Sequence, residues 1–269
     1  MSFKNKVVVV TGSGSGMGAA TAELFAEEGA HVVIVDCSET RAYTTAQKCE
    51  QYGNKVLVII ANVSKQEDDE KIIKQTIENF GKLDVLVNNA GTVADEKILD
   101  GTILDTYDKV MNTNLRSVVA LTSLAAPHLA KTKGCIVNTS SVASTTIKAG
   151  YPYPSYCVSK AGVDSFTRVS AFELASSGIR VNAVNPGPVN TNILENAGVS
   201  GSWEECAKST ALKKVSEPKE VANLIFVNPA STTLLGRPSD VDEIGEIILY
   251  LASDKAKIDE YFVFFFCVF

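Results

Sequence analysis

The sequence predicts an α/β fold in which helices cover both faces of a doubly wound, mostly parallel sheet. Short apolar segments alternate along the chain with segments of helical periodicity, which is the order of repeated strand–helix–strand units. The apolar segments are continuous, as strands buried on both faces of a sheet are. The chain has 269 residues, 45% of them hydrophobic, which is enough for one such sheet and its helices.

Each expected strand is a short run rich in branched aliphatic residues. The six strands are predicted at residues 7–10, 32–35, 56–60, 85–87, 135–138 and 180–184. Neighbouring parallel strands need a crossover of about a dozen residues or more, and the segments between these runs are long enough to supply it. The crossovers are expected to be right-handed, with their helices packed on the sheet.

Glycines end several of the helices that connect these strands. The helices are predicted at residues 17–28, from after the second strand to residue 46, and at residues 71–80, 106–129 and 155–175. Gly29, Gly81 and Gly178 stand just beyond three of them, where a left-handed residue commonly ends a helix. No linker interrupts the pattern, so we expect one domain over residues 1–269, with ligands at the carboxyl ends of the strands.

A glycine-rich segment, residues 11–18, connects the first strand to the first helix. Its glycines let the backbone turn tightly and approach a pyrophosphate, and the helix that follows offers free N–H groups and a positive dipole end. Its place between a strand and a helix favours a dinucleotide site over a plain flexible turn. The residues expected to contact the dinucleotide here are Gly12, Ser13, Ser15, Gly16, Met17 and Gly18.

Asp36 ends the second strand about 20 residues beyond the glycines, where an acidic side chain can bind ribose hydroxyls. The alternative is that Asp36 caps the helix that begins near Ser38. A carboxylate at this place would also repel a 2′-phosphate. Arg41 follows closely but is expected to project from the next helix, so NAD is favoured over NADP.

Composition excludes several classes of partner. A formal net charge of −6 gives no electrostatic case for nucleic acid or an anionic membrane surface. The six cysteines are scattered, as in a reduced cytoplasmic protein, and His31 and His128 are too far apart to suggest a metal site. No apolar run reaches the roughly 18 residues of a membrane span, and nothing before the first strand resembles a signal peptide.

Further motifs follow the later strands in a fixed order. They are Asn88-Asn89-Ala90-Gly91, Asn114, Ser140-Ser141, Tyr156 with Lys160, and the segment from Asn185 to Thr191. With the glycine-rich segment, these motifs resemble those of the short-chain dehydrogenase/reductase family in its single-domain form, over about residues 5 to 195. The resemblance implies a Rossmann fold, a nicotinamide cofactor and hydride transfer to or from an alcohol or carbonyl substrate.

Tyr156 and Lys160 lie four residues apart in a predicted helix and therefore share a face. A free tyrosine has a pKa of about 10 and is a poor base at neutral pH. A nearby ammonium favours the phenolate and lowers that pKa, so Tyr156 could take a proton from an alcohol or donate one in reduction. Of the eight tyrosines, only Tyr156 has a lysine four residues later, which favours this role over an ordinary surface pair.

The resemblance also implies roles for two polar residues. Ser141 would orient the substrate oxygen, although it lies 15 residues before Tyr156 where the family usually has 13. We interpret the difference as a two-residue insertion in the loop 145–154; Ser140 is the alternative, and a turn serine is a third possibility. Asn114 would hold a water that links Lys160 to solvent, unless it only bonds backbone within its helix.

The remaining cofactor contacts are expected at the ends of the other strands. Asn62 stands where the family often has an aspartate that contacts adenine, and Thr191 would reach the carboxamide of the nicotinamide. The full set implied by the resemblance is Asn62, Val63, Asn89, Ala90, Gly91, Pro186, Gly187, Val189 and Thr191, together with Tyr156 and Lys160.

Apolar residues surround the expected reaction site and suggest a hydrophobic alcohol or ketone of medium size, unless they only pack the loop down. They are Tyr151, Tyr153, Ile193, Leu194, Val199 and Trp203.

The C-terminal segment 216–269 departs from the family pattern. Residues 216–222 resemble the approach to the family's last helix, but a second version follows at Gly236, and we interpret 228–235 as part of an inserted or duplicated stretch. The family's final strand is missing after Asp254. The apolar tail 255–269 is expected to replace it, or else to form an aggregation-prone edge.

The sequence thus favours an NAD(H)-dependent alcohol dehydrogenase or carbonyl reductase, and the resemblance implies a homo-oligomer, either a dimer or a tetramer. An NADP(H)-dependent carbonyl reductase is one alternative. A dinucleotide-binding regulator without turnover is another; the altered C-terminus supports it, whereas the presence of Tyr156 and Lys160 opposes it. A sugar epimerase would need a larger substrate domain.

Overall fold

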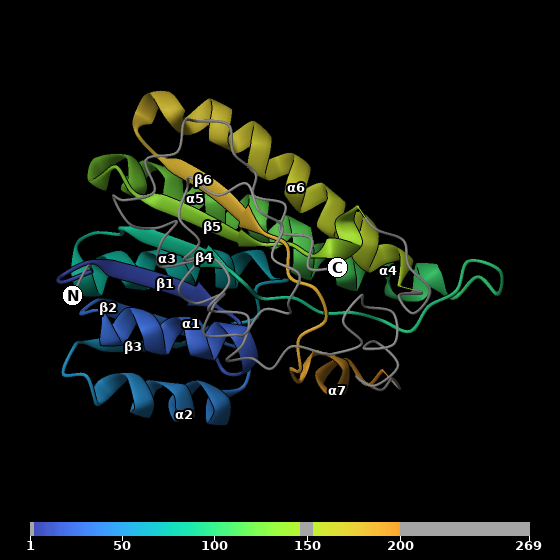
Figure 1. Ribbon diagram of the computed structural model, residues 1–269, viewed down its shortest axis with the longest axis horizontal. Helices are drawn as coiled ribbons and strands as arrows, with labels where there is room; N and C mark the ends of the chain where they lie inside the picture. The colour runs from blue at the N-terminus through green and yellow to red at the C-terminus, as the bar shows by residue number, and fades with distance from the viewer. Residues whose placement is uncertain (1–2, 146–152, 200–269) are drawn as a thin grey trace, which may run out of the picture.

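The computed structural model describes residues 3–145 and 153–199, which form a parallel six-stranded sheet between two layers of helices (Figure 1). The strands are β1 (Val7–Thr11), β2 (His31–Asp36), β3 (Val56–Ile60), β4 (Val85–Asn88), β5 (Cys135–Thr139) and β6 (Arg180–Val184). They lie in the order β3-β2-β1-β4-β5-β6. The predicted fold class is confirmed, and all six predicted strands are present.

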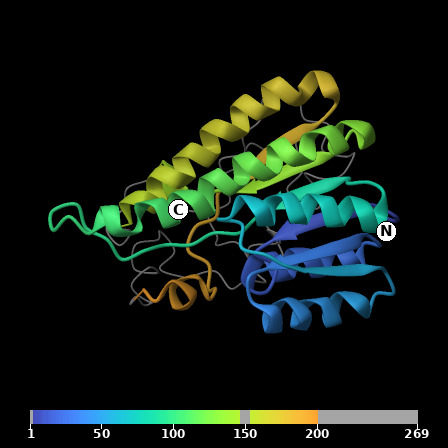
Figure 2. The same ribbon diagram turned by 180° about the vertical axis from the view of Figure 1, so that it is seen from behind.

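Helices α1 (Gly16–Glu27) and α2 (Glu39–Glu50) cover one face of the sheet, and α3 (Gln66–Phe80), α5 (Ser117–Thr132) and α6 (Pro154–Leu174) cover the other (Figures 1 and 2). The remaining helices are α4 (Ile103–Met111), which packs on α6, and the short α7 (Ile193–Ala197). Single turns of 3-10 helix are η2 (Val142–Ser144) and η3 (Ala175–Ser177), and a π turn, η1 (Asn112–Arg116), stands between α4 and α5.

The core explains why the strands are continuously apolar. Val8 and Val10 of β1 pack toward α1 and α2, whereas Val7 and Val9 pack toward α3 and α5. All four valines are buried, so neither face of the central strand meets water. Phe25 of α1 is buried in the cluster between the sheet and helices α1 and α2.

The order of the strands reverses beside β1, and this reversal places the site. Chain order runs outward from β1 to β3 in one direction and from β4 to β6 in the other. Val10 of β1 is paired in register with Val87 of β4, so the segments that follow these strands emerge side by side. A crevice at this switch point is where open α/β sheets bind ligands.

The expected single helix over 106–129 is divided in the structure. It begins earlier, at Ile103, and the π turn Asn112–Arg116 interrupts the α-helical hydrogen bonding before α5 continues to Thr132. Asn114 lies buried in the middle of this turn. Single π turns inside α-helices are frequent at functional sites.

The expectations about the segment 216–269, the tail 255–269, Tyr151 and Trp203 lie outside the described residues. Within residues 3–145 and 153–199, no helix is both long and apolar enough to cross a membrane. In the same ranges, no three His, Cys, Asp or Glu side chains group as metal ligands.

Candidate active site at the carboxyl edge of the sheet

A pocket of about 560 Å³ opens at the carboxyl ends of the strands, within the range of roughly 300–1,000 Å³ that small-molecule sites occupy. Most of the residues singled out in the sequence line it. They are Gly12, Ser15, Gly16, Met17, Asp36, Asn62, Val63, Asn89, Ala90, Gly91, Ser141, Tyr156, Lys160, Pro186, Gly187, Val189 and Thr191. Ser13, Gly18 and Asn114 do not line it.

The glycine-rich segment forms a cradle that no larger residue could form. Gly12 has φ +64°, and a Cβ atom there would lie 2.8 Å from the Ala90 Cα. A Cβ on Gly18 would overlap the Gly12 carbonyl oxygen, so Gly18 serves the close packing of α1 beneath the loop. The first turn of α1 carries no acidic residue, which leaves its positive dipole end open to an anion. This cradle fits a pyrophosphate.

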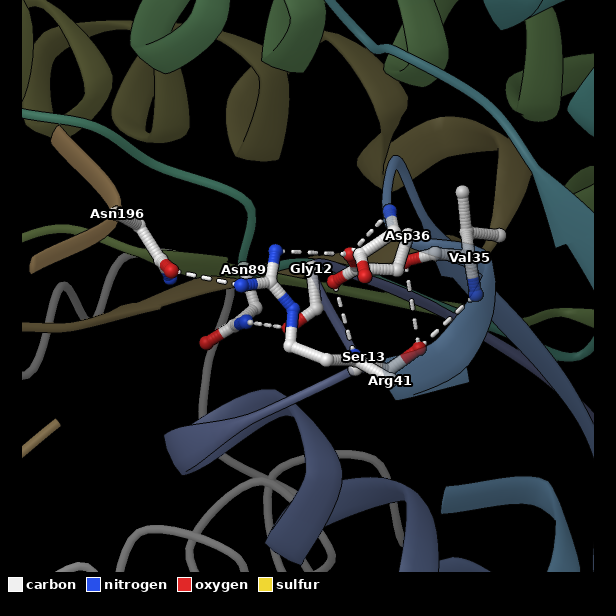
Figure 3. Close-up of polar contacts among 9 residues, drawn as sticks. Gly12, Ser13, Val35, Asp36, Arg41, Asn89 and Asn196 are labelled. Carbon is white, nitrogen blue, oxygen red and sulfur yellow. Dashed lines mark hydrogen bonds and ion pairs between the residues drawn. The ribbon is translucent and has the colours of Figure 1, made fainter. Parts of the chain in front are cut away.

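Ser13 differs from its expected role. Its hydroxyl donates to the Val10 carbonyl at 2.8 Å and accepts from the Val35 amide at 2.9 Å, and the residue is fully buried. Both bonds tie the loop to the sheet, and Figure 3 shows the contact between Ser13 and Val35. The side chain of Ser13 therefore shapes the cradle rather than facing the pocket.

Asn89 connects the glycine-rich loop to the end of β4. Its side-chain amide donates to the Thr11 carbonyl at 3.0 Å and to the Gly12 carbonyl at 3.3 Å. The Thr11 hydroxyl in turn accepts from the amides of Asn89 and Ala90, at 3.0 and 3.1 Å. These bonds hold the two segments together across the switch point, which keeps the floor of the pocket rigid.

Asp36 is held at the mouth of this cradle by backbone amides. Its Oδ2 accepts from the Gly14 amide at 2.9 Å, and its Oδ1 accepts from the Ser38 amide at 2.8 Å. The second contact goes to Ser38, the residue just before α2, and is a turn bond rather than the helix cap that the sequence suggested as an alternative; Asp36 lines the pocket. Its position fits a ribose hydroxyl.

Arg41 does project from α2, but its guanidinium turns back over Asp36 and lines the pocket (Figure 3). Its Nη2 lies 3.5 Å from Asp36 Oδ1, and its Nη1 donates to Asn196 Oδ1 at 2.6 Å. This second contact could not be predicted from local sequence patterns, because Arg41 and Asn196 are far apart in the chain.

Tyr156, Ser141 and Lys160 meet at the other end of the pocket. The side chain of Ser141 is hydrogen-bonded to that of Tyr156, and the Lys160 ammonium lies 5.7 Å from the centre of the tyrosine ring. Burial raises the pKa of Tyr156, and the bond with Ser141 partly lowers it again. We had expected the Lys160 ammonium to lower this pKa, but in the structure burial dominates.

Lys160 is itself buried, and its ammonium donates to the Thr139 carbonyl at 2.6 Å. Burial lowers the pKa of Lys160 to about 8, against the opposing charge of Asp164 one turn further along α6. Ser140, the alternative to Ser141, donates to the Lys160 carbonyl at 3.1 Å and so supports the helix from below.

Asn114 is buried behind these residues. Its side-chain oxygen accepts from the Thr92 amide at 2.8 Å, and its amide donates to the Thr92 carbonyl at 2.9 Å and to the Ser159 hydroxyl at 3.0 Å. The side chain thus bonds backbone, but of the segment after β4 rather than of its own helix. This arrangement joins the π turn, the strand end and α6.

The other expected contacts lie along the same edge. Asn62 accepts from the amide and the hydroxyl of Ser64 through its Oδ1, which leaves its NH2 group for an adenine ring. The Thr191 methyl group lies against Gly16, where a Cβ atom would be 3.0 Å away. Pro186 accepts from the Val142 amide at 3.0 Å, which fixes the segment after β6 beside Ser141.

Glu96 was missed in the sequence; it does not line the pocket but supports the helix that carries Tyr156. Glu96, in the segment after β4, is buried and accepts from the amide and the hydroxyl of Ser155, next to Tyr156. Its Oε2 also accepts from the Thr106 hydroxyl at 2.7 Å. A carboxylate at the N-terminal turn of a helix is favoured by the helix dipole. No motif marks it, since its partners are distant in the chain.

Comparisons with known proteins agree with this geometry. A family model described as enoyl-(acyl carrier protein) reductase matches residues 12–227. The chain is 36% identical to a meso-2,3-butanediol dehydrogenase of Serratia marcescens, over 96% of this chain and 91% of that protein. It is 34% identical to a 3-oxoacyl-[acyl-carrier-protein] reductase of Thermotoga maritima, over 96% and 94%.

A solved structure is similar to this chain as well. A short-chain dehydrogenase/reductase of unknown function from Caenorhabditis elegans, crystallised with cofactor, has a TM-score of 0.76 and 34% identity over 94% of this chain and 89% of that one. The sheet, the nucleotide cradle and these relatives lead to one assignment: the chain belongs to the short-chain dehydrogenase/reductase family, whose members are oxidoreductases that use a nicotinamide cofactor on alcohol or carbonyl groups.

Proposed function

We propose that this protein is an NAD(H)-dependent dehydrogenase or carbonyl reductase in which Tyr156 transfers the proton. One observation carries the proposal: Tyr156, Ser141 and Lys160 gather at one end of a pocket whose other end holds the glycine cradle and Asp36. Bound there, the nicotinamide would supply or accept the hydride. The residues of the chain supply position and the proton.

The chemistry assigned to these side chains follows from their contacts. Ser141 would hold the substrate oxygen, because its hydroxyl already bonds Tyr156. Tyr156 would take the alcohol proton in oxidation and return it in reduction. Lys160, charged at neutral pH, would stabilise the phenolate. Asn114 would act behind Lys160, holding a water that links it to solvent.

The preference for NAD rests on Asp36. A 2′-phosphate would meet this carboxylate, which two backbone amides hold in place, whereas ribose hydroxyls can donate to it. NADP(H) is the second candidate, and one observation favours it: the Arg41 guanidinium lies at the same place and could pair with a phosphate.

The substrate is proposed to be a hydrophobic alcohol or ketone. Leu194 and Val199 form an apolar cluster with Val93, and Ile193, Tyr153 and Tyr156 pack against it. Two relatives are named for meso-2,3-butanediol and 3-oxoacyl chains, so small diols and 3-oxoacyl thioesters are the first substrates to test.

Assembly and location are proposed from exposed apolar side chains and from the cysteines. Val158, Val169 and Phe172 share an exposed face of α6, and Val119 of α5 is exposed as well, which suits a dimer or a tetramer. The four cysteines in the described residues form no disulfide, as in a reducing cytoplasm: Cys37, Cys49, Cys135 and Cys157. We propose a single domain over 1–269 with an atypical segment at 216–269.

The test is a titration of the full chain with NADH and with NADPH, followed by nicotinamide fluorescence. Tight NADH binding with at least roughly tenfold weaker NADPH binding supports the Asp36 assignment, and the reverse selects the NADP(H) candidate. A substrate screen then compares wild type with Tyr156→Phe, which is expected to lose turnover and keep NADH affinity. NADH binding without turnover on any substrate would favour a regulator.

A further inference from the structure

The helix α7 lies between the two ends of the pocket. On one side, Leu194 packs in the apolar cluster that Tyr156 contacts. On the other side, Asn196 accepts the hydrogen bond from Arg41, whose guanidinium lies between Asn196 and Asp36 (Figure 3). A helix of five residues thus bridges the reaction end and the adenosine end of the pocket.

Arg41 binds α7 more closely than it binds Asp36. Its Nη1–Asn196 Oδ1 distance is 2.6 Å, whereas its Nη2–Asp36 Oδ1 distance is 3.5 Å. Asp36 is already held by the amides of Gly14 and Ser38, so it does not need Arg41 to stay in place. The Arg41 Nε is buried without a hydrogen-bond partner, a cost that folded proteins seldom accept without a reason.

We propose that Arg41 is a positioning residue for the substrate: through Asn196 it fixes α7 against the Tyr156 side of the pocket. This inference rests on the proposed function, and it links the binding of the cofactor to the binding of the substrate. A 2′-hydroxyl can bind Asp36 and leave the Arg41–Asn196 contact intact. A 2′-phosphate, with its larger negative charge, draws the guanidinium away from Asn196 and loosens α7.

The anchor can be tested without cofactor, by amide hydrogen exchange across 193–199. The amides of Asn196, Gly198 and Val199 donate to the carbonyls of Asn192, Glu195 and Leu194, so their exchange reports the opening of α7. Arg41→Ala and Asn196→Ala are each expected to speed exchange about tenfold, and the double variant no more than either. Asn196→Asp keeps the acceptor oxygen and should match wild type, as should Lys48→Ala, a change at an exposed site on α2. Unchanged exchange in Arg41→Ala, or effects that multiply, would overturn the proposal.

Kinetics test the link to the substrate. Arg41→Ala and Asn196→Ala should each raise the KM for the alcohol by the same factor, about fivefold. The kcat and the NADH Kd should stay within roughly twofold of wild type. A rise in NADH Kd that parallels the rise in KM would make Arg41 a plain cofactor contact and overturn the inference.

In wild type, NADPH but not NADH should speed amide exchange across 193–199, and equal effects of the two cofactors would count against the inference. If NADH fails to bind wild type, the proposed function fails, while the cofactor-free exchange experiment still decides the anchor.

Discussion

Glu96 holds Ser155 by two hydrogen bonds, one from the serine amide and one, at 2.8 Å, from its hydroxyl. Ser155 immediately precedes Tyr156 in the first turn of α6. A carboxylate from the segment after β4 therefore fixes the start of the helix that carries both Tyr156 and Lys160.

Glu96→Gln should lower kcat about tenfold while the NADH Kd stays unchanged, because an amide cannot accept all three bonds and Tyr156 shifts. Steady-state kinetics and NADH titration measure the two effects. Glu50→Gln, an exposed change on α2, is the matched control. A lower melting temperature with unchanged kcat would show that Glu96 supports stability alone.

Lys160→Met should abolish turnover and yet raise the free energy of unfolding at pH 7 by about 1–3 kcal/mol, because the buried ammonium is costly. Burial lowers the pKa of Lys160 from 10.5 to about 8. Since the folded-state pKa lies below the unfolded value, wild type gains stability as the pH rises from about 8 to 10.5. The advantage of the variant should therefore shrink over that range.

Urea unfolding at pH 7, 8, 9 and 10 measures this trend. Lys48→Met, at an exposed position, should show no such pH dependence. A variant that is less stable than wild type at pH 7 would mean that the bond from Lys160 to the Thr139 carbonyl outweighs the cost of burial.

Asp69→Asn should stabilise the protein, and more so at higher pH. Asp69 is fully buried, neither of its oxygens has a hydrogen bond, and its ion pair with Arg116 is long, at 3.6 Å. Burial raises the pKa of Asp69 to about 7, with Arg116 opposing. A raised folded-state pKa contributes stability that is lost as the pH rises through 7, so the gain from Asn should grow from about pH 4 to 7 and then level off.

The gain at pH 8 is expected to be on the order of 2 kcal/mol, measured by chemical denaturation across this pH range. Asp108→Asn, on the exposed side of α4, serves as the control. A gain that is the same at pH 5 and pH 8 would contradict the assigned ionisation of Asp69.

Gly18→Ala should weaken NADH binding at least about tenfold, since the new Cβ would overlap the Gly12 carbonyl oxygen and displace the cradle. Gly53→Ala is the contrasting control. Its Cβ would meet nothing within 4 Å, but φ is +79° there, so it should lower the melting temperature and leave NADH affinity unchanged. Equal NADH affinity in both variants would contradict the role assigned to Gly18 in the cradle.

The strands and the cradle could be predicted because their signals are local. A run such as Val7 to Val10 is apolar at every position, and the structure buries all of it. The paired motif of Tyr156 and Lys160 needed only helical spacing. In contrast, the contacts of Glu96 with Ser155 and of Arg41 with Asn196 join distant parts of the chain, and nothing local to either residue encodes its partner.

The π turn also escaped prediction. Residues 112–116 contain neither proline nor glycine, and although Asn112, Thr113 and Asn114 are weak helix formers, propensity does not distinguish a π turn from a regular α-helical turn. What distinguishes the turn is the pair of bonds between the Asn114 side chain and the backbone of Thr92, which is a tertiary effect. Ser13 is predicted to contact the cofactor, but its hydroxyl bonds Val10 and Val35, and these contacts form only once the sheet assembles.

The π turn makes chain length, as well as residue identity, a requirement at Asn114. It lengthens the helical path between α4 and α5 by one residue, which offsets their phases by about 100° from those of an unbroken helix. With the phases offset in this way, Val110 before the turn and Val118 after it are both buried. Deleting a single residue from 112–116 would restore a regular α-helix and keep Val110 and Val118 on one face, but it would remove the turn that brings the Asn114 side chain to the backbone of Thr92. Insertions and deletions should therefore be as rare in this turn among related sequences as replacements of Asn114 itself.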